Sequence, residues 1–282
     1  HVTVRTTLLS HVKEALEAGV RQVIFGGESF SHRPISWKDY EEAVRLCHEA
    51  GAEILFPTPR VVREKYQARS QAQLRKLLTL LPDGVVLEYA GAIEWVKGEE
   101  SLAVWAGPSM NIFNSEAEKE IERLGFSGCF LSQELTIPQI RHIAKGSDIP
   151  LGAYVYGRTE MMISEYCAIN AVMGDKDKKH CPMYCMRGRF ALKDEEGRRF
   201  PIHTDEWCHM HIANCHVLDM RPYFDELKKA GLSALTLDVR GNEGSILSLC
   251  KDACDILCGR KEAPGAGRGD DVTRGHFFRG VL

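Results

Sequence analysis

The chain alternates short apolar runs with longer amphipathic stretches, and this alternation restricts its fold more than any other feature. Short runs of β-branched and aromatic residues indicate buried strands, while apolar residues spaced three and four apart indicate helices. Seven strands are predicted at residues 2–5, 22–25, 53–56, 85–89, 102–105, 128–131 and 151–155. Helices are predicted at residues 9–18, 38–50, 62–81, 115–124 and 137–145, and an eighth strand at 234–239 precedes a helical pattern over 245–257. These repeated units indicate an α/β protein.

Eight strand–helix units in about 260 residues match a TIM barrel, a closed parallel sheet surrounded by helices. An open, doubly wound sheet is the alternative, but no Gly-x-Gly-x-x-Gly follows the first strand, where a dinucleotide site needs it. We therefore predict a modified (β/α)8 TIM barrel, with residues 1–282 forming a single domain. Residues 91–100 form the weakest predicted helix, and Ser115 with Glu118 has the spacing of a helix-capping box.

The seventh and eighth predicted strands are separated by about eighty residues, far more than the connection between a strand and a helix requires. We call residues 157–231 of this connection the insertion. A segment that leaves the end of a barrel strand emerges on the C-terminal face, where barrel enzymes keep their active sites. The insertion is therefore predicted to lie over the mouth of the barrel.

Cysteines and histidines gather in this insertion. The cysteines are Cys167, Cys181, Cys185 and Cys208, and the histidines are His180, His209 and His211. Such groups hold zinc or an iron–sulfur cluster, and four thiolates suit both. We predict a metal site formed by the four cysteines, with His180 joining it if two chains of a homodimer share one ion. Disulfides are disfavoured, because they stabilise mostly small secreted domains.

Charged residues near the ends of predicted strands are candidates for substrate binding and catalysis. Glu88 closes an apolar run, where a carboxylate must be paired or used chemically, and Glu134 follows the sixth strand. We predict Glu88 and Glu134 as acid or base groups. Arg158, Arg187 and Arg189 are predicted to bind carboxylate or phosphate groups of a substrate, because the planar guanidinium fork suits both. A helix cap or a solvated loop is the alternative explanation for each residue.

A basic and aromatic strip follows the central cysteines. It consists of Arg187, Arg189, Phe190, Arg198, Arg199 and Phe200. This composition favours an RNA or ring-compound substrate. The same residues are equally explained by a solvated hairpin over residues 190–201 that turns at residues 195–197.

The net charge says little about partners. Lys+Arg 36 against Asp+Glu 39 leaves a net charge of -3, so no overall attraction to nucleic acid is evident, although a local basic groove is compatible with this balance. No apolar run approaches the eighteen or so residues of a membrane span. We expect a cytoplasmic protein with no membrane partner. Because the chain starts with His1, we also expect it to be one domain of a longer protein.

Several further motifs together carry a resemblance. The insertion opens with Gly-Arg-Thr-Glu-Met-Met-Ile-Ser-Glu-Tyr-Cys at 157–167 and continues with His-Cys-Pro-Met-Tyr-Cys-Met-Arg-Gly-Arg-Phe at 180–190. Phe-Pro-Ile at 200–202, Asp-Glu-Trp-Cys at 205–208, Thr-Arg-Gly-His-Phe-Phe-Arg-Gly-Val at 273–281 and Phe-Gly-Gly-Glu-Ser-Phe at 25–30 complete the set. Over nearly its whole length the chain resembles the collagenase-like peptidases of family U32.

The resemblance implies a TIM-like barrel and a peptidase activity without an agreed catalytic machinery. In several relatives four cysteines hold a four-iron four-sulfur cluster, and those relatives hydroxylate RNA bases or a quinone precursor without molecular oxygen. Here the cluster ligands would be Cys167, Cys181, Cys185 and Cys208. One departure concerns residues 163–166, Ile-Ser-Glu-Tyr, which stand where the collagenase-like branch has a Gly-Ser-small motif. This departure argues against a direct transfer of collagen cleavage.

Residue chemistry supplies no clear peptidase mechanism. Neither Gly-x-Ser-x-Gly nor His-Glu-x-x-His occurs, and Cys208 beside His209 and His211 is a nominal thiol nucleophile. Three functions stay open. The first is a peptidase of the U32 type with a cysteine and histidine metal site, acting on a peptide substrate. The second is an iron–sulfur-dependent hydroxylase acting on RNA or a small ring compound, and the third is a noncatalytic barrel with a structural metal. The resemblance puts the peptidase first.

Overall fold

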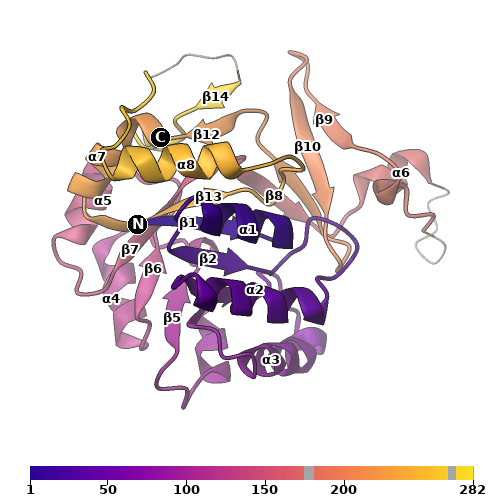
Figure 1. The fold of residues 1–282 in the computed structure, drawn as a ribbon. Helices are drawn as coiled ribbons and strands as arrows, with labels where there is room; N and C mark the ends of the chain where they lie inside the picture. Colours follow the sequence, from indigo (N-terminus) through magenta and orange to yellow (C-terminus); the bar gives the residue numbers. More distant parts are fainter. Residues whose placement is uncertain (175–180, 266–270, 282) are drawn as a thin grey trace.

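The computed structural model describes residues 1–174, 181–265 and 271–281, and it contains a closed eight-stranded parallel barrel (Figure 1). The strand order is β13-β1-β2-β3-β4-β5-β6-β7, and β13 also pairs with β7, which closes the sheet. The barrel strands are β1 (Val2–Thr6), β2 (Gln22–Phe25), β3 (Glu53–Pro57), β4 (Gly84–Leu87), β5 (Ala103–Ala106), β6 (Gly128–Phe130), β7 (Leu151–Gly157) and β13 (Leu232–Asp238). The predicted TIM barrel is confirmed.

Helices surround the barrel and cover the outer faces of its strands (Figure 1). The α-helices are α1 (Leu9–Glu17), α2 (Trp37–Glu49), α3 (Glu64–Leu78), α4 (Ser115–Arg123), α5 (Ile137–Ala144), α7 (Phe224–Lys229) and α8 (Leu247–Leu257). The shorter 3-10 helices are η1 (Ala90–Trp95), η2 (Pro108–Met110) and η5 (Arg221–Tyr223). The weak helix predicted at 91–100 is thus reduced to the 3-10 helix η1.

The cap of α4 differs from the sequence prediction. Asn114 is the N-cap, and its side-chain oxygen accepts a hydrogen bond from the backbone N–H of Ala117. Ser115 is the first helical residue, and Glu118 is buried, where its carboxylate accepts a hydrogen bond from Ser147 Oγ at 2.5 Å. The capping box predicted at Ser115 and Glu118 is therefore wrong, because the preceding asparagine satisfies the free N–H groups instead.

Two apolar clusters hold the fold together. The larger one fills the space between the strands and the helices. The smaller one fills the inside of the barrel, and it consists of Ile24, Leu55, Val86, Trp105, Phe130, Tyr154 and Ala234. Side chains alternate along a strand, so Val4 packs toward the helices while its neighbour Arg5 points into the barrel. A charged side chain therefore lies beside the apolar filling of the barrel.

The connection between β7 and β13 carries a second, smaller sheet. Its four antiparallel strands run in the order β8-β11-β10-β9. They are β8 (Glu160–Ser164), β9 (Phe190–Lys193), β10 (Arg199–Thr204) and β11 (Met210–Ala213), and α6 (Ala168–Met173) and η4 (Tyr184–Met186) lie between β8 and β9. Figure 1 shows β9, β10 and α6 standing away from the barrel. The pairing of β9 with β10 confirms the predicted hairpin.

Two further strands lie at the end of β7. β12 (Val217–Asp219) pairs antiparallel with β7, and β14 (Val272–Thr273) pairs with β12. Phe277 after β14 is buried, and its carbonyl accepts a hydrogen bond from the backbone N–H of Ile137. The last described residues thereby lie against the barrel.

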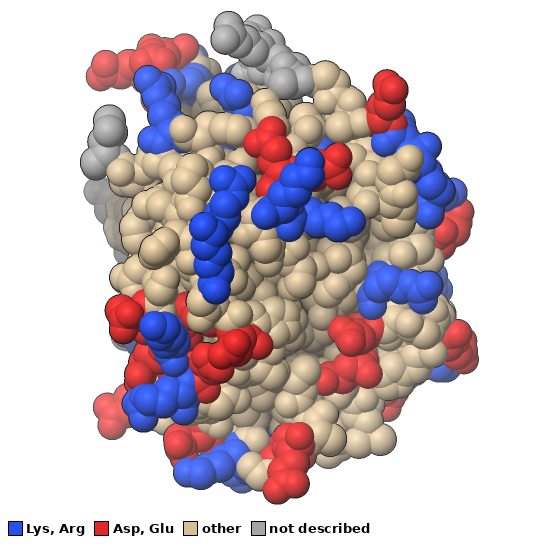
Figure 2. Space-filling view, turned by 90° about the vertical axis from the view of Figure 1, so that its left-hand side faces the viewer, with Lys and Arg blue, Asp and Glu red and all other residues tan. Residues whose placement is uncertain are grey.

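The surface is mixed in charge. On the side of the molecule that Figure 2 shows, lysine and arginine side chains lie beside aspartate and glutamate, in keeping with the net charge of -3. Among the described helices, none has both the length and the apolar character needed to span a bilayer.

Candidate active site at the barrel mouth

A buried arginine stands at the centre of the barrel. Arg5 on β1 is 1% exposed, and its Nη1 donates hydrogen bonds to Glu88 Oε1 at 3.0 Å and to the Tyr154 hydroxyl at 2.8 Å. Burial alone would lower the pKa of the guanidinium, but Tyr154, Glu88 and Asp238 outweigh it and raise that pKa well above its ordinary value. Arg5 is thus a fixed positive charge at the base of the mouth.

Glu28 joins this charge to two more arginines. Its carboxylate accepts hydrogen bonds from Arg60 Nε at 3.1 Å and from Arg240 Nη1 at 3.3 Å, and it lies 3.8 Å from Arg5 Nη2. Burial alone would raise the pKa of Glu28, but the guanidinium groups of Arg60, Arg240 and Arg5 hold it at about 2. The carboxylate is therefore ionised at ordinary pH, and it cannot serve as a general base because its pKa is too low.

Arg60 also binds the insertion to the barrel. Its Nη1 and Nη2 donate to Glu160 Oε1 at 2.5 Å and to Oε2 at 2.8 Å, a bidentate pair. Arg60 follows β3, whereas Glu160 begins β8 of the small sheet. One side chain thus links the barrel carboxylate Glu28 to the insertion.

His211 on β11 continues the chain of ion pairs. Its Nδ1 lies 2.9 Å from Glu160 Oε2, and its Nε2 lies 3.0 Å from Asp205 Oδ2. Since both ring nitrogens face carboxylate oxygens, both are best satisfied as donors, which is the protonated imidazolium. Burial opposes this form, but the hydrogen bonds to Asp205 and Glu160 outweigh burial and raise the pKa of His211.

Asp205 is the last residue of this series of ion pairs, and it organises the turn that carries Cys208. Its Oδ2 also lies 2.9 Å from His209 Nδ1, and its Oδ1 accepts from the backbone N–H groups of Trp207 at 2.9 Å and His209 at 2.8 Å. Cys208 lies inside this turn with a φ of 62°, a left-handed conformation that L-residues adopt only when their surroundings hold them there. A continuous network therefore runs from the barrel axis to the turn of Cys208.

The four predicted metal ligands lie in one part of the insertion. Cys167 caps α6, Cys185 lies in η4, Cys181 is exposed just before η4, and Cys208 occupies the turn described above. Burial raises the pKa of the Cys208 thiol, and the nearby thiols of Cys181 and Cys185, the Asp205 carboxylate and the Cys167 thiol raise it further. Because α6 also contacts η4, Cys167 and Cys185 belong to neighbouring segments of the insertion.

Within residues 1–174, 181–265 and 271–281, no group of three or more His, Cys, Asp or Glu side chains is already arranged around a single-ion position. A four-iron cluster is larger than one ion and spreads its ligands more widely, and four thiols are its usual donor set. Four thiols in one part of the insertion thus fit a cluster by donor chemistry. His180 lies outside the described residues, and the sharing of one ion between two chains stays a prediction.

A cavity of about 520 Å³, the mouth cavity, opens above the barrel interior. Arg5 and Tyr154 line its base, and Glu134, Arg158 and Asp238 line its walls. The lining of the mouth cavity therefore carries charges of both signs, and the Arg5 charge at its base is compensated by Glu88.

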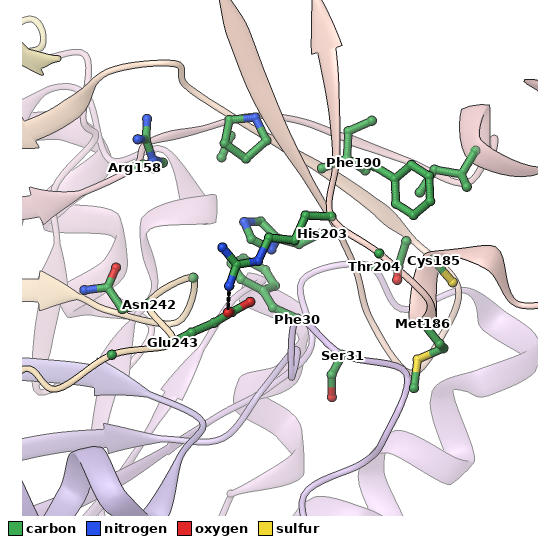
Figure 3. A pocket seen from close by; sticks show the side chains of 18 of the residues that line it. Phe30, Ser31, Arg158, Cys185, Met186, Phe190, His203, Thr204, Asn242 and Glu243 are labelled. Carbon is green, nitrogen blue, oxygen red and sulfur yellow. Dashed lines mark hydrogen bonds and ion pairs between the residues drawn. The ribbon is translucent and has the colours of Figure 1, made fainter.

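A second cavity of about 760 Å³, the hairpin cavity, lies under β9 and β10. Figure 3 shows Cys185 on one side of it and Arg158 on the other, with Phe30 and His203 between them. The Phe30 and His203 rings are stacked, with centroids 5.0 Å apart and planes 7° from parallel. Because Arg158 and Asp238 also line the mouth cavity, the two cavities adjoin.

The residues predicted for catalysis and substrate binding lie partly beneath the mouth cavity and partly on the cavity walls. Glu88 is 2% exposed and accepts from Ser109 Oγ at 2.6 Å as well as from Arg5, so it is a paired residue beneath the mouth. Glu134 and Arg158 are exposed on cavity walls, and Arg158 donates to the Asn214 carbonyl at 3.0 Å.

The two hairpin arginines take different positions. Arg189 lines the hairpin cavity and forms an ion pair with Glu243, drawn as a dashed line in Figure 3. Arg187 is exposed and lies over the Tyr184 ring, 5.6 Å from its centroid. Arg189 is thus the one of the two that reaches a cavity together with Arg158.

The thiol-protease dyad that the sequence offers, Cys208 with His209 or His211, is not formed. His209 and His211 are both bound to Asp205, and the imidazole beside the sulfur belongs to His32, whose two ring nitrogens lie 3.9 Å from Sγ. The pKa of Cys208 is raised, first by burial, whereas a nucleophilic cysteine needs a lowered one.

Sequence reasoning missed Arg5, Glu160, Asp238 and Arg240. Arg5 had a detectable signal, because it is a charge inside the apolar run of the first strand, the same signal that selected Glu88. Glu160 and Arg240 lie in segments with many other charges, and their partners are far away in sequence, so no local pattern marks them.

Comparison with known proteins addresses the family. The model of peptidase family U32 matches residues 8–253. A curated relative, the 23S rRNA 5-hydroxycytidine C2501 synthase of Escherichia coli, is 25% identical over 191 residues, which cover 66% of this chain and 29% of the relative. The match thus spans less than a third of the relative's length.

Solved structures agree on the fold. A thiamine phosphate pyrophosphorylase from Pyrococcus furiosus superposes with a TM-score of 0.52 at 12% identity, over 92% of this chain and 95% of that one. A phosphoribosylanthranilate isomerase from Thermotoga maritima gives 0.50 at 13% identity, over 92% and 98%. These likenesses concern the barrel alone. From the family match over most of its length, the chain belongs to peptidase family U32.

Proposed function

We propose that this chain is the barrel domain of an enzyme that hydroxylates a base of RNA, using an iron–sulfur cluster held by Cys167, Cys181, Cys185 and Cys208. The observation that carries the proposal is the composition of the hairpin cavity. Cys185 lines the same cavity as Arg158 and Arg189, so a proposed cluster ligand and two predicted anion-binding groups face one space. This arrangement favours the hydroxylase over the peptidase that the family resemblance put first.

The curated relative supports the substrate class. Its name states that it makes 5-hydroxycytidine in 23S rRNA, and its match to this chain includes 66% of the residues here. Because the match covers 29% of that protein, the RNA substrate and the reaction are proposals for this chain.

The residues of the two adjoining cavities have separate tasks in this proposal. Arg158 and Arg189 bind phosphate oxygens of the RNA backbone. The His203 ring is the flat group against which a base can lie, because the Phe30 ring is already covered by His203 and Arg240. Glu134, exposed on the wall of the mouth cavity, is the carboxylate in position to exchange a proton with a bound substrate.

The proposed hydroxylation needs a co-substrate besides the RNA. Conversion of C–H to C–OH on a base adds one oxygen atom and removes two electrons, so an oxygen donor or water with an electron acceptor must be a co-substrate. A cluster, when bound, supplies electron transfer or Lewis acidity. The network from Arg5 to Asp205 then holds the turn of Cys208 at a fixed place relative to the mouth cavity.

The test is the nucleoside composition of RNA. We expect RNA from cells that express the protein to contain a hydroxylated nucleoside that is absent when Cys185 is replaced, as Cys185→Ser, and retained in the control Cys258→Ser, an exposed cysteine at the end of α8. Mass spectrometry of digested RNA measures this. An RNA profile identical in wild type and Cys185→Ser would contradict the proposal.

A peptidase is the second candidate, and the description of the matched family favours it. In that case zinc in place of a cluster would activate water at an open ligand position. Peptide cleavage by purified wild-type protein that is lost on metal removal would replace the hydroxylase with the peptidase.

A further inference from the structure

A third cavity lies on the outer side of the turn that carries Cys208. It has a volume of about 370 Å³, and we call it the outer groove. One wall comes from the start of α3 and the loop before it, and the other comes from the insertion at Glu165 and Trp207–His209. None of its residues lines the mouth or hairpin cavity, so it is a separate site.

Two aromatic rings from different walls meet in the outer groove. Tyr66 on α3 and Trp207 in the turn have ring centroids 5.7 Å apart and planes inclined by 52°. Tyr66 is 37% exposed, and Trp207 is partly exposed. The two rings contact each other and both are partly exposed, and exposed aromatic rings are a surface on which flat ligands stack.

Cationic side chains lie on the same rings. The Arg69 guanidinium carbon is 4.6 Å from the Trp207 centroid, and Lys65 Nζ is 4.5 Å from the Tyr66 centroid. The carboxylate in the groove, Glu165, forms an ion pair with Arg63. The aromatic rings are therefore accompanied by a net positive charge.

We propose that the outer groove binds an unpaired base of single-stranded RNA together with its phosphate. This inference rests on the proposed function, which it deepens by adding a substrate-binding site. A nucleobase stacks on aromatic rings and on guanidinium planes, while lysine and arginine contact the adjacent phosphate. Cys208 lines the groove, so a strand held there runs beside the proposed cluster ligand.

Single-stranded RNA fits better than a duplex or a peptide. In a duplex the bases are stacked and paired, so their faces cannot stack on the exposed rings. An acidic peptide could pair its carboxylates with Lys65 and Arg69, but the aromatic pair would add little to its binding affinity. The combination of aromatic rings and cations is what selects a base with its phosphate.

The experiment measures binding of a fluorescently labelled, unstructured RNA of about ten nucleotides to the full chain, purified without oxygen, by fluorescence anisotropy. Trp207→Ala is expected to weaken binding by about tenfold or more, since stacking of one base contributes that much. Trp207→Phe should restore most of the affinity, because a flat ring remains. The matched control is Trp37→Ala on α2, which removes a tryptophan that also lies under a lysine, Lys76, but far from the groove in sequence and outside its lining.

The outcomes separate this inference from the proposed function. If Trp207→Ala binds the RNA within twofold of the wild-type affinity, the proposal that the outer groove binds RNA is overturned, while the hydroxylase proposal stays intact. A preference for duplex RNA of the same sequence would also overturn it. If the wild-type protein binds no RNA even at low salt, both the RNA-binding role of the outer groove and the proposed RNA substrate are overturned.

Discussion

Glu88 is the predicted catalytic residue whose environment gives it a clear structural task. Its carboxylate compensates the charge of Arg5 in a pair that is almost fully buried, with a distance of 3.0 Å. Removal of one partner from such a pair leaves an uncompensated buried charge, which costs about 3 kcal/mol or more. Glu88→Gln should therefore lower the free energy of unfolding by about that amount.

Urea unfolding measures this difference. The matched control is Glu94→Gln, which breaks an exposed ion pair with Lys97 and should change stability by less than about 0.5 kcal/mol. A loss below about 1 kcal/mol in Glu88→Gln would show that Arg5 is held by its other neighbours, and that Glu88 is available for chemistry.

Glu28 gives a prediction about pH. Its pKa is held at about 2 in the folded protein against an ordinary value of 4.5, so its stabilising effect is complete above pH 4.5 and is lost as the pH falls toward 2. The advantage of wild type over Glu28→Gln should be equal at pH 7 and pH 5. It should shrink by about 1.4 kcal/mol per pH unit below about pH 4.5. Unfolding free energies from urea titrations at these pH values test this, and a constant difference down to pH 3 would contradict it.

The small sheet and its cysteines are the element on which the proposed chemistry depends. Metal binding and local folding are coupled when ligands come from short segments, as here from α6, η4 and the turn of Cys208. Joint replacement of Cys181 and Cys185 by serine should remove bound iron and increase amide hydrogen exchange in Ala168–Met173 of α6. The barrel strands should keep their protection.

Hydrogen exchange followed by mass spectrometry, with iron analysis, measures both effects. Cys258→Ser is the control, because Cys258 is exposed at the end of α8 on the barrel. Unchanged iron content in the double variant would show that these cysteines do not hold the metal.

Secondary elements were predictable from sequence to the extent that local composition decides them. Strands buried on both faces require continuous apolar runs, which are visible in the sequence. Each predicted strand corresponds to a strand of the barrel, although β7 extends to Gly157. The helix predicted at 62–81 shortens to Glu64–Leu78, although Leu81 continues the apolar spacing, because Leu81 precedes Pro82 and adopts a left-handed φ of 56°. The cap of α4 moved by one residue because Asn114 and Ser115 both carry an oxygen suited to the task.

The site was predictable only in part. The clustering of cysteines is visible in the sequence itself, and the spacing of strands along the chain predicts that the insertion leaves the C-terminal end of β7. The ion pairs do not, because Arg60 and Glu160 are 100 positions apart and Glu160 and His211 are 51 apart. Contacts over such separations depend on how the small sheet docks on the barrel, which no local pattern specifies.

At the scale of the whole molecule, the barrel and the insertion each contribute different residues to the candidate site. The barrel provides a rigid end with Arg5, Glu28 and Glu88 fixed in place. The insertion adds the cysteines and closes two cavities over and beside that end, and the Arg60–Glu160 pair ties the two parts together. The central claim is that the cysteines hold an iron–sulfur cluster at this junction.

The most direct test of that claim is metal and sulfide analysis, with a visible spectrum, of wild-type protein purified without oxygen. A four-iron cluster predicts about four irons and about four sulfides per chain, with broad absorption at the blue edge of the visible range that is bleached by a reductant. A colourless protein that carries one zinc per chain, or no metal, would contradict the claim.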